Sequence, residues 1–462
     1  MKRFLIFLLL SHATAFSQNI SGDWSGEISI SGMKLGFGMY ISEVNGQFQS
    51  VMDIPEQKAM GIPMTSTIFS ENKITIESKE MRGVFSGEYK DDKFSGTFSQ
   101  NGASMPFSMT RGKYVMKVIK RPQEPKPSYD YEVREVTFTN KTDNVILAGT
   151  LTVPKGKGPF PAVVLVSGSG QQNRNSEILE HKPFLVIADY LTKNGIAVLR
   201  YDDRGVGGSN GNPAISTSAN FALDAQAATT FLHKTKGINK KKIGIIGHSE
   251  GGMIAPMVAA NPKNKIGFLV LLAGPAVSGG DILLEQQALI SRANGESEVE
   301  IEQNRKMSMA LFQFLNENKA KGTSKEELKL WVMNYFTSHE ITIPESMTTE
   351  QMAETLANAY SNPWVQYFIL HDPKSDLLKL KCPVLALNGA KDLQVPSTLN
   401  LTTFNKYAEI SGNIHFTTKE FPDLNHLFQH CTTGSPNEYQ DIEETFSPEV
   451  LNYFKDWIVN LK

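Results

Sequence analysis

One serine stands where a strand-like segment gives way to a helix-like one. In the stretch KIGIIGHSEGGMIAP (residues 242–256), Ser249 lies between His248 and Glu250, with glycines on both sides. The pattern G-x-S-x-G between a strand and a helix is typical of a strained turn that exposes a nucleophilic hydroxyl. A serine hydroxyl is a weak nucleophile at neutral pH, so it needs a base, an acid that orients the base, and donors for the oxyanion.

A second copy of the pattern shows that the pattern alone is weak evidence. Residues 207–211, GGSNG, also match G-x-S-x-G around Ser209. This copy follows a polar loop and runs into NPAIS, with no apolar strand before it and no helix after it. We therefore predict that Ser249, and not Ser209, is the nucleophile. The surrounding loop YDDRGVGGS is expected to be structural, with Asp202 or Asp203 paired with Arg204.

Two later segments offer an acid and a base. Asp392 follows an apolar run and a turn in CPVLALNGAKDLQVP, and His426 lies in KEFPDLNHLFQH. Asp392 would hold the ring of His426 in the tautomer that accepts the serine proton, and would stabilise the imidazolium that forms. His430 and Asp423, in the same loop as His426, are weaker candidates for the base and the acid.

Backbone donors for the oxyanion are expected at two places. The N–H of Glu250 opens the predicted helix after Ser249, where the helix N-terminus favours negative charge. The second donor is expected on the glycine-rich loop VSGSGQQNRN (residues 166–175), with the N–H of Ser169 as first candidate and that of Gly170 close behind. An ordinary turn between strand and helix is the alternative interpretation of this loop.

The elements that must position these residues change character along the chain. From residue 19 to 112, short alternating segments such as NKITIES, and the hairpin arms VFSGEY and KFSGTFS, predict a small all-β barrel or sandwich domain. The proline-rich run RPQEPKPSYDY belongs to an extended linker predicted over residues 113–130. From 131 to 462, apolar runs alternate with helical patterns, which predicts an α/β domain with a mostly parallel sheet covered on both faces.

An insertion interrupts that alternation between about residues 276 and 380. Charged helical patterns such as KEELKLWVMNYF predict that it is helical and sits on the sheet. Its later part, NPWVQYFILHDP, places Trp364, Tyr367 and Phe368 together. These three residues either line a substrate pocket or pack the insertion onto the core, and the sequence favours neither.

The first residues, MKRFLIFLLLSHATAFSQ, have the form of an export signal. Two basic residues precede a short apolar run and then small residues, which predicts a signal peptide over residues 1–17. The run is too short to span a membrane and no later segment is long enough, so no integral membrane segment is expected after cleavage. We therefore expect an exported protein, periplasmic or extracellular.

The composition excludes several functions. Forty-six Lys and Arg residues against 48 Asp and Glu give a formal net charge of -2, which offers no case for nucleic acid or an anionic membrane surface as a partner. No zinc motif and no phosphate loop occurs, so no metal and no cofactor is expected. Cys382 and Cys431 are the only two cysteines, and free thiols are favoured over a disulfide between them.

These motifs together resemble those of a known family. Residues 131–462, apart from the insertion, resemble the α/β-hydrolase superfamily through residues 247–252 and through YDDRGVGGSNG, CPVLALNGAKDLQVP and DLNH. The resemblance is to secreted bacterial esterases of the serine aminopeptidase type, some of which carry a β-rich N-terminal extension. It implies an eight-stranded, mostly parallel sheet, a helical cap, and a triad of Ser249, Asp392 and His426. Many relatives have His-Gly where this chain has Ser167 and Gly168.

We therefore expect a carboxylic ester hydrolase that acts on a small-molecule ester through an acyl-enzyme. The first alternative is a serine peptidase acting on short peptides, because the same triad cleaves amides. A carboxylate in the cap that holds a substrate amino group would favour it. The second alternative is a binding protein with an inert hydrolase fold, whose β domain recognises a glycan or a partner.

Overall fold

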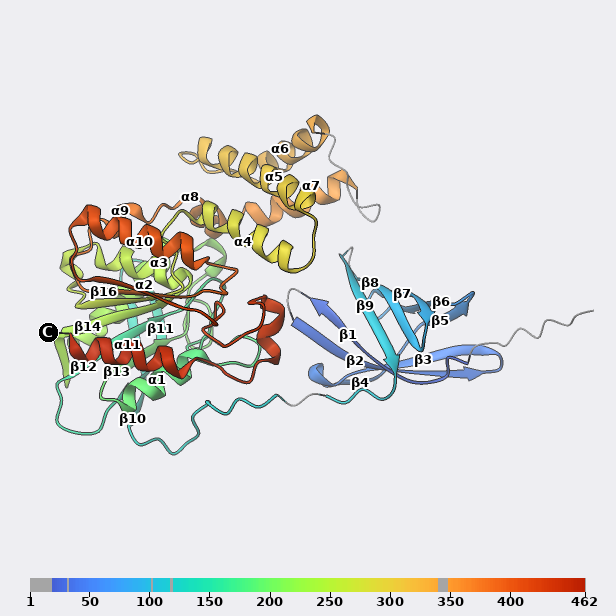
Figure 1. Cartoon of the computed structure of the whole chain (residues 1–462), viewed down its shortest axis with the longest axis horizontal. Coiled ribbons are helices and arrows are strands. Elements are labelled where there is room, and N and C mark those ends of the chain that lie inside the picture. The colour runs from blue at the N-terminus through green and yellow to red at the C-terminus, as the bar shows by residue number, and fades with distance from the viewer. Residues whose placement is uncertain (1–18, 31–32, 101–102, 117–118, 340–347, 462) are drawn as a thin grey trace, which may run out of the picture. The chain divides into compact units, whose positions relative to one another are not determined.

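The structure is a computed structural model that describes residues 19–30, 33–100, 103–116, 119–339 and 348–461. The chain forms two compact units, Met1–Val118 and Ile119–Lys462 (Figure 1). The predicted signal peptide lies outside the described residues. Within the part that is described, no helix combines the length and the apolar character needed to cross a membrane.

The N-terminal unit is a single antiparallel sheet in the order β4-β3-β2-β1-β9-β8-β7-β6-β5, in which the first strand of the unit pairs with its last. Alternate side chains of a strand are buried, as at Ile74 and Ile76, because successive residues point to opposite faces. The strands are β1 (Gly22–Ile30), β2 (Met33–Val44), β3 (Gln47–Ile54), β4 (Ala59–Pro63), β5 (Ser66–Ser70), β6 (Lys73–Ser78), β7 (Gly83–Lys90), β8 (Lys93–Gln100) and β9 (Ala103–Arg111).

The two ends of this sheet approach each other. β4 pairs with β3, β5 pairs with β6, and only two residues separate β4 from β5. The hydroxyl groups of Ser50 in β3 and Thr67 in β5 share a hydrogen bond of 2.6 Å. Of the two closures that the sequence left open, the sheet approaches the barrel: it is curved as a half-barrel, and its end strands β4 and β5 pair only with β3 and β6.

The inside of the barrel is filled by its own side chains. Trp24 is fully buried, its ring meets that of Phe94 edge-on at 4.7 Å, and its Nε1 donates to the carbonyl of Ile20 at 2.8 Å. Phe85 and Phe107 pack in the same cluster. Trp24 and the phenylalanines therefore form the core of this unit.

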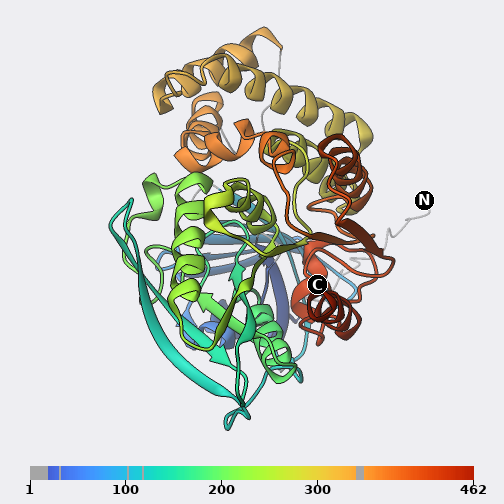
Figure 2. The same cartoon turned by 90° about the vertical axis from the view of Figure 1, so that its left-hand side faces the viewer.

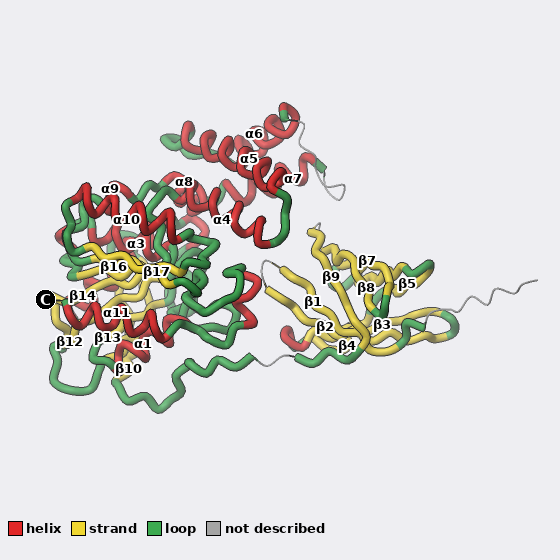
Figure 3. Tube along the Cα trace, in the orientation of Figure 1, coloured by secondary structure: helices red, strands yellow, loops and turns green. Residues whose placement is uncertain are grey.

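The second unit is built on one eight-stranded sheet in the order β10-β11-β13-β12-β14-β15-β16-β17 (Figure 3). The β10–β11 and β11–β13 pairs are antiparallel and the other five are parallel, as the resemblance implies. The strands are β10 (Glu132–Asn140), β11 (Val145–Val153), β12 (Phe160–Val166), β13 (Ala197–Tyr201), β14 (Ile238–His248), β15 (Phe268–Leu272), β16 (Val384–Gly389) and β17 (Phe416–Phe421).

Helices cover both faces of this sheet (Figure 2). In β12, Val164 packs with α2 (Ser218–Lys234), α3 (Glu250–Ala259) and α10 (Ser397–Ser411), whereas Val163 and Leu165 pack with α1 (Pro183–Lys193) and α11 (Pro448–Asn460). Both faces are therefore buried, which explains why the strands are continuous apolar runs in the sequence.

A group of helices follows β15, within the insertion predicted from the sequence. Three of them begin at capping boxes: Ser297 with Glu300, Ser324 with Glu327, and Thr348 with Gln351. The helices are α4 (Gly279–Ala293), α5 (Glu298–Glu317), α6 (Lys325–Ser338), α7 (Thr349–Tyr360), α8 (Pro363–Leu370) and α9 (Lys374–Leu377). We refer to α4–α8 as the cap.

The segment before β10 is extended and lies against the second unit. Arg121 donates to the carbonyls of Leu179 and Gln440, and the amide of Gln123 bonds to the main chain of Thr445 and Phe446. These residues fall in the predicted linker of residues 113–130. The later part of that segment is therefore fixed to the hydrolase unit by polar contacts.

Candidate active site

Ser249 lies on a strained turn between β14 and α3. Its φ of 55° and ψ of −121° are values that a residue with a side chain seldom adopts. The flanking glycines are required by close contact: a Cβ on Gly247 would lie 2.0 Å from the carbonyl oxygen of Gly251, and a Cβ on Gly251 would lie 2.1 Å from that of Val166. The turn therefore exposes the hydroxyl at the carboxyl end of the sheet.

Asp392 and His426 meet at the same edge of the sheet. Asp392 follows β16 and His426 follows β17, and Nδ1 of the ring donates to Oδ2 of the carboxylate at 2.8 Å. The other carboxylate oxygen accepts from the main-chain N–H groups of Gln394 and Val395, each at 2.8 Å. Both side chains are buried, so the ring is fixed with Nε2 as its free acceptor.

The structure brings Ser249 and His426 together in one cavity of about 260 Å³. The competing candidates lie elsewhere. His430 is exposed and bonds to Glu444 through Nδ1 at 2.8 Å, and Asp423 pairs with Lys391.

The oxyanion loop passes close to the serine. A Cβ on Gly168 would lie 3.0 Å from that of Ser249, and Ser169 lines the same cavity. Gly170, the second predicted donor, has a φ of 92° and is not among the lining residues in the described part of the chain. Of the two, the structure places Ser169 next to the nucleophile.

The carboxylate of Asp203, which we expected to pair with Arg204, instead binds the loop of residues 166–175. Oδ1 of Asp203 accepts from the hydroxyl of Ser167 at 2.9 Å, and Oδ2 accepts from the main-chain N–H of Gln172 at 2.9 Å. Burial raises the pKa of Asp203 to about 7. Ser167, which replaces the histidine of many relatives, thus ties the start of the loop to Asp203.

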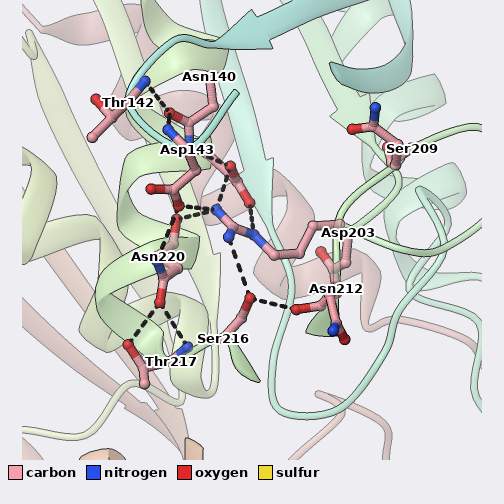
Figure 4. A network of polar contacts seen from close by, with 12 residues as sticks. Asn140, Thr142, Asp143, Asp203, Ser209, Asn212, Ser216, Thr217 and Asn220 are labelled. Atoms are coloured by element: carbon pink, nitrogen blue, oxygen red, sulfur yellow. Dashed lines mark hydrogen bonds and ion pairs between the residues drawn. The ribbon is translucent and has the colours of Figure 1, made fainter. Parts of the chain in front are cut away.

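The expected pairing of Arg204 with Asp202 or Asp203 is wrong. Arg204 is buried and pairs with Asp224 at 2.7 Å and Asp143 at 2.8 Å, in a network that also includes Ser216 and Asn220 (Figure 4). Asp202 pairs with Arg174 at 2.7 Å. Neighbouring residues of the turn point in different directions, so adjacency in sequence does not bring their charges together.

Ser209 belongs to the same structural region. Its buried hydroxyl donates to the carbonyl of Asp202 at 2.7 Å and accepts from the N–H of Ala148 at 2.9 Å. The hydroxyl is thus engaged on both sides in holding the loop to β11.

His248 contacts His426. Its Nε2 donates to the main-chain carbonyl of His426 at 2.9 Å, and the two ring centroids are 4.8 Å apart. Burial, with a smaller contribution from His426, lowers the pKa of His248 to about 3, so the ring is neutral at physiological pH.

The side chain of Glu250 joins elements that the sequence did not connect. It is 2% exposed, and Oε1 accepts from the hydroxyl of Ser218 at 2.6 Å and from Nε1 of Trp364 at 2.8 Å. The hydroxyl of Ser169 bonds to the same carboxyl group. Burial raises the pKa of Glu250. Only its N–H was a sequence candidate, because nothing in the pattern indicates what its side chain contacts.

The three predicted pocket residues point to two places. Trp364 and Phe368 line the catalytic cavity and stack at 5.4 Å, whereas Tyr367 lines a separate cavity of about 860 Å³ beside His371. Positions 364 and 368 share one face of α8, and 367 and 371 share another.

The described ranges hold no group of three or more His, Cys, Asp or Glu residues placed to bind a metal ion. Cys382 and Cys431 are free thiols, the state that the sequence favours, and burial raises the pKa of each to about 11.

Known proteins resemble this chain to different extents. A family model described as serine aminopeptidase, S33, matches residues 177–324, which include Ser249 but not Asp392 or His426. Esterase EstD of Thermotoga maritima is 26% identical over 382 residues, which are 80% of this chain and 80% of that protein. This share is larger than the second unit alone, so the alignment extends into the N-terminal unit.

Two further similarities are weaker. Polyketide transferase af380 of Aspergillus fumigatus is 32% identical over 129 residues, which are 28% of this chain and 41% of that protein. The structure of Pyrococcus furiosus esterase PF2001 aligns with 74% of this chain and 98% of the esterase chain. The identity is 17% and the TM-score is 0.43.

The fold of the second unit follows from its topology. Its sheet is mostly parallel with one antiparallel edge, its serine lies on a strained turn between a strand and a helix, and the family model covers that turn. The second unit has the α/β-hydrolase fold, and the similarities to the S33 family and to Esterase EstD support a hydrolase.

Proposed function

We propose that this hydrolase is a serine esterase that cleaves carboxylic esters of small molecules. Ser249 is the nucleophile, His426 the general base, and Asp392 the acid that orients it. The observation that carries the proposal is the hydrogen bond of 2.8 Å between Asp392 and His426, with His426 and Ser249 lining one cavity.

The reaction has two halves. His426 Nε2 takes the proton of Ser249 as Oγ attacks the acyl carbon, and the resulting imidazolium is stabilised by Asp392. The N–H groups of Glu250 and Ser169 stabilise the oxyanion. His426 then protonates the departing alcohol, and a water molecule deprotonated by the same ring hydrolyses the acyl-enzyme and frees Ser249.

The lining of the cavity favours an ester over a peptide with a free amino terminus. None of its lining residues in the described ranges is Asp or Glu. The nearby carboxyl group of Glu250 already accepts hydrogen bonds from Ser218 and Trp364. A substrate ammonium group would be desolvated there without a counter-charge. The similarity to Esterase EstD supports the same choice.

An active-site probe and a substrate panel test the proposal. A fluorophosphonate should label the purified chain and fail to label Ser249→Ala, whereas Ser209→Ala should still be labelled. The chain should hydrolyse p-nitrophenyl esters and leave aminoacyl-p-nitroanilides intact. Equal labelling of Ser249→Ala would refute the nucleophile assignment, and cleavage of the anilides alone would establish the peptidase alternative.

We also propose that residues 1–17 direct export, on the basis of their sequence pattern. Expression in a bacterial host with an intact export system should yield a periplasmic or extracellular protein that begins after Ala15 or Ser17. N-terminal sequencing checks the cleavage position. A cytoplasmic product that retains Met1 would contradict the proposal.

A further inference from the structure

A second cavity lies inside the cap, next to the catalytic cavity. It has a volume of about 550 Å³ and lies among α4, α5 and α7. Leu283 and Gln286, one turn apart on α4, line both cavities. The two cavities therefore adjoin along α4, and we call the one in the cap the cap chamber.

The lining of the cap chamber is mixed. Leu284, Met307 and Leu311 contribute apolar walls, and Gln287 and Arg305 contribute polar groups. Asn294 and Glu296 lie beyond the last turn of α4. From Leu283 to Asn294, α4 extends roughly 16 Å at 1.5 Å per residue. The chamber thus has the length and the surface to bury an extended alkyl chain, which displaces water from its walls.

We propose that the cap chamber binds a long alkyl chain of the substrate, so that the protein prefers esters of long-chain acids or alcohols. This proposal rests on the esterase function proposed above. The chain would pass Leu283 and Gln286 while the ester carbonyl lies at Ser249.

Chain-length kinetics on a blocked variant test this proposal. Ser291 lines the cap chamber but not the catalytic cavity, so Ser291→Trp fills the chamber at a distance from Ser249. Parent kcat/KM should rise from p-nitrophenyl acetate to the dodecanoate. Ser291→Trp should lose about tenfold or more on the dodecanoate, the scale on which apolar pockets discriminate, and keep its rate on the acetate. Leu330→Trp, on an exposed position of α6, is the matched control.

Two further experiments distinguish the possible results. Comparing p-nitrophenyl dodecanoate with dodecyl acetate tells whether the chamber takes the acid or the alcohol chain. Calorimetry of dodecanoate binding to Ser249→Ala, with and without Ser291→Trp, needs no catalysis. Binding that Ser291→Trp weakens supports the chamber even if no ester is cleaved, in which case the esterase function alone fails. Ester cleavage with no chain-length preference, and no dodecanoate binding, overturns the chamber and leaves the esterase function standing.

A separate observation concerns Glu250. Its carboxyl group is contacted by Ser218 at the start of α2, by Trp364 in the cap, and by Ser169 in the oxyanion loop. Glu250 also follows Ser249 directly, so its main chain forms part of the nucleophile turn. One buried side chain therefore connects the turn, the oxyanion loop and the cap.

We infer that Glu250 is a positioning residue that keeps the loop of Ser169 and the cap helix α8 in register with Ser249. Within the described ranges, Oε1 of Glu250 is the acceptor for both Trp364 Nε1 and the Ser218 hydroxyl. An apolar side chain at 250 would leave both donors buried without a partner, and they would move to find one. A glutamine at 250 keeps one acceptor oxygen in place.

Kinetics and labelling test this role. Glu250→Met should lower kcat on p-nitrophenyl acetate by about tenfold or more, since a displacement of about 1 Å at a reacting group costs up to 10²-fold. Glu250→Gln should recover most of the loss. Trp364→Phe should lower kcat less, and its effect should not add to that of Glu250→Met, because both remove one interaction. Trp331→Phe, elsewhere in the cap, is the control.

The outcomes separate positioning from folding and from the proposed chemistry. A lower Tm with unchanged kcat, or additive effects of the two substitutions, overturns the positioning role. The rate of fluorophosphonate labelling gives the same comparison if no ester is turned over. A parent protein that is not labelled refutes the nucleophile assignment, whereas parent and Glu250→Met labelled at the same rate refute only the role of Glu250.

Discussion

His248 donates a hydrogen bond of 2.9 Å to the main-chain carbonyl of His426. The residue before the nucleophile thus fixes the backbone of the proposed base, and it does so across 178 positions of the chain. The bond needs a proton on Nε2 of His248, which the neutral ring carries when Nδ1 is unprotonated.

The substitution His248→Ala should lower kcat with little change in KM. Removing the donor frees the loop of His426, and misplacement of a catalytic group by about 1 Å costs on the order of 10²-fold at most. Steady-state kinetics on p-nitrophenyl acetate measures the effect. His430→Ala, at an exposed position paired with Glu444, should behave as the parent. Equal kinetics of His248→Ala and the parent would refute the supporting role.

Substitutions of the proposed triad residues should lower kcat by different amounts. Ser249→Ala should lower kcat by on the order of a millionfold, and Asp392→Asn by about ten-thousandfold because it favours the wrong tautomer of His426. Ser209→Ala should lower Tm and keep kcat, because its hydroxyl bonds only to main-chain groups. Loss of kcat in Ser209→Ala without loss of stability would contradict the assignment.

The carboxyl group of Asp203 should make stability fall as pH rises. Its pKa in the folded state is raised to about 7, above the value of an unfolded aspartate near 3.8, so the folded state binds more protons between these values. Its contribution to the free energy of unfolding therefore decreases from about pH 4 to 7 and then levels off. Asp203→Asn should remove that decrease, which urea unfolding at a series of pH values measures.

Other groups have the opposite sign, and their contribution has to be subtracted. Burial lowers the pKa of His181 to about 4 and that of His248 to about 3, so the unfolded state binds more protons at both rings and stability rises toward pH 6.5. The quantity to compare is therefore the difference between Asp203→Asn and the parent at each pH. Asp456→Asn, at an exposed position on α11, should give a constant difference. The same constant difference for Asp203→Asn would contradict the buried, proton-binding carboxyl group.

The buried ion pairs of Arg204 should contribute strongly to the free energy of unfolding and should not contribute to catalysis. Arg204→Met leaves Asp224 and Asp143 without their counter-charge, a change that typically destabilises by about 3–5 kcal/mol. Arg292→Met breaks the exposed pair with Glu298 and should lower the free energy of unfolding far less, because water screens that pair. Urea unfolding measures both. A similar effect of the two substitutions would contradict the importance of burial.

Much of the architecture could be predicted because it depends on local pattern. The inner strands of the second unit were visible as apolar runs, since both faces of the sheet are buried there, whereas the edge strands β10 and β17 carry exposed polar residues. Ser249 could be chosen over Ser209 because the strand and helix around it are adjacent in sequence. Asp392 and His426 each follow a predicted strand, and parallel strands bring their carboxyl ends to one edge.

What could not be predicted depends on contacts between loops far apart in the sequence. The acceptor role of Glu250 toward Trp364 and that of Asp203 toward Ser167 involve side chains from different strand ends. The choice between barrel and sandwich depends on how the two ends of a sheet meet at Ser50 and Thr67. The separation of Tyr367 from Phe368 was accessible in principle, because helical spacing assigns them to different faces.

The order of strands has a consequence for when the chemistry can begin. The proposed nucleophile follows β14, whereas its proposed acid and base follow β16 and β17, and β17 is the outermost strand at its edge of the sheet. During synthesis from the N-terminus, a chain that has emerged only as far as α3 carries Ser249 without Asp392 or His426. If the proposed triad is correct, we therefore expect an incomplete chain to lack hydrolytic activity until the last strand has been made.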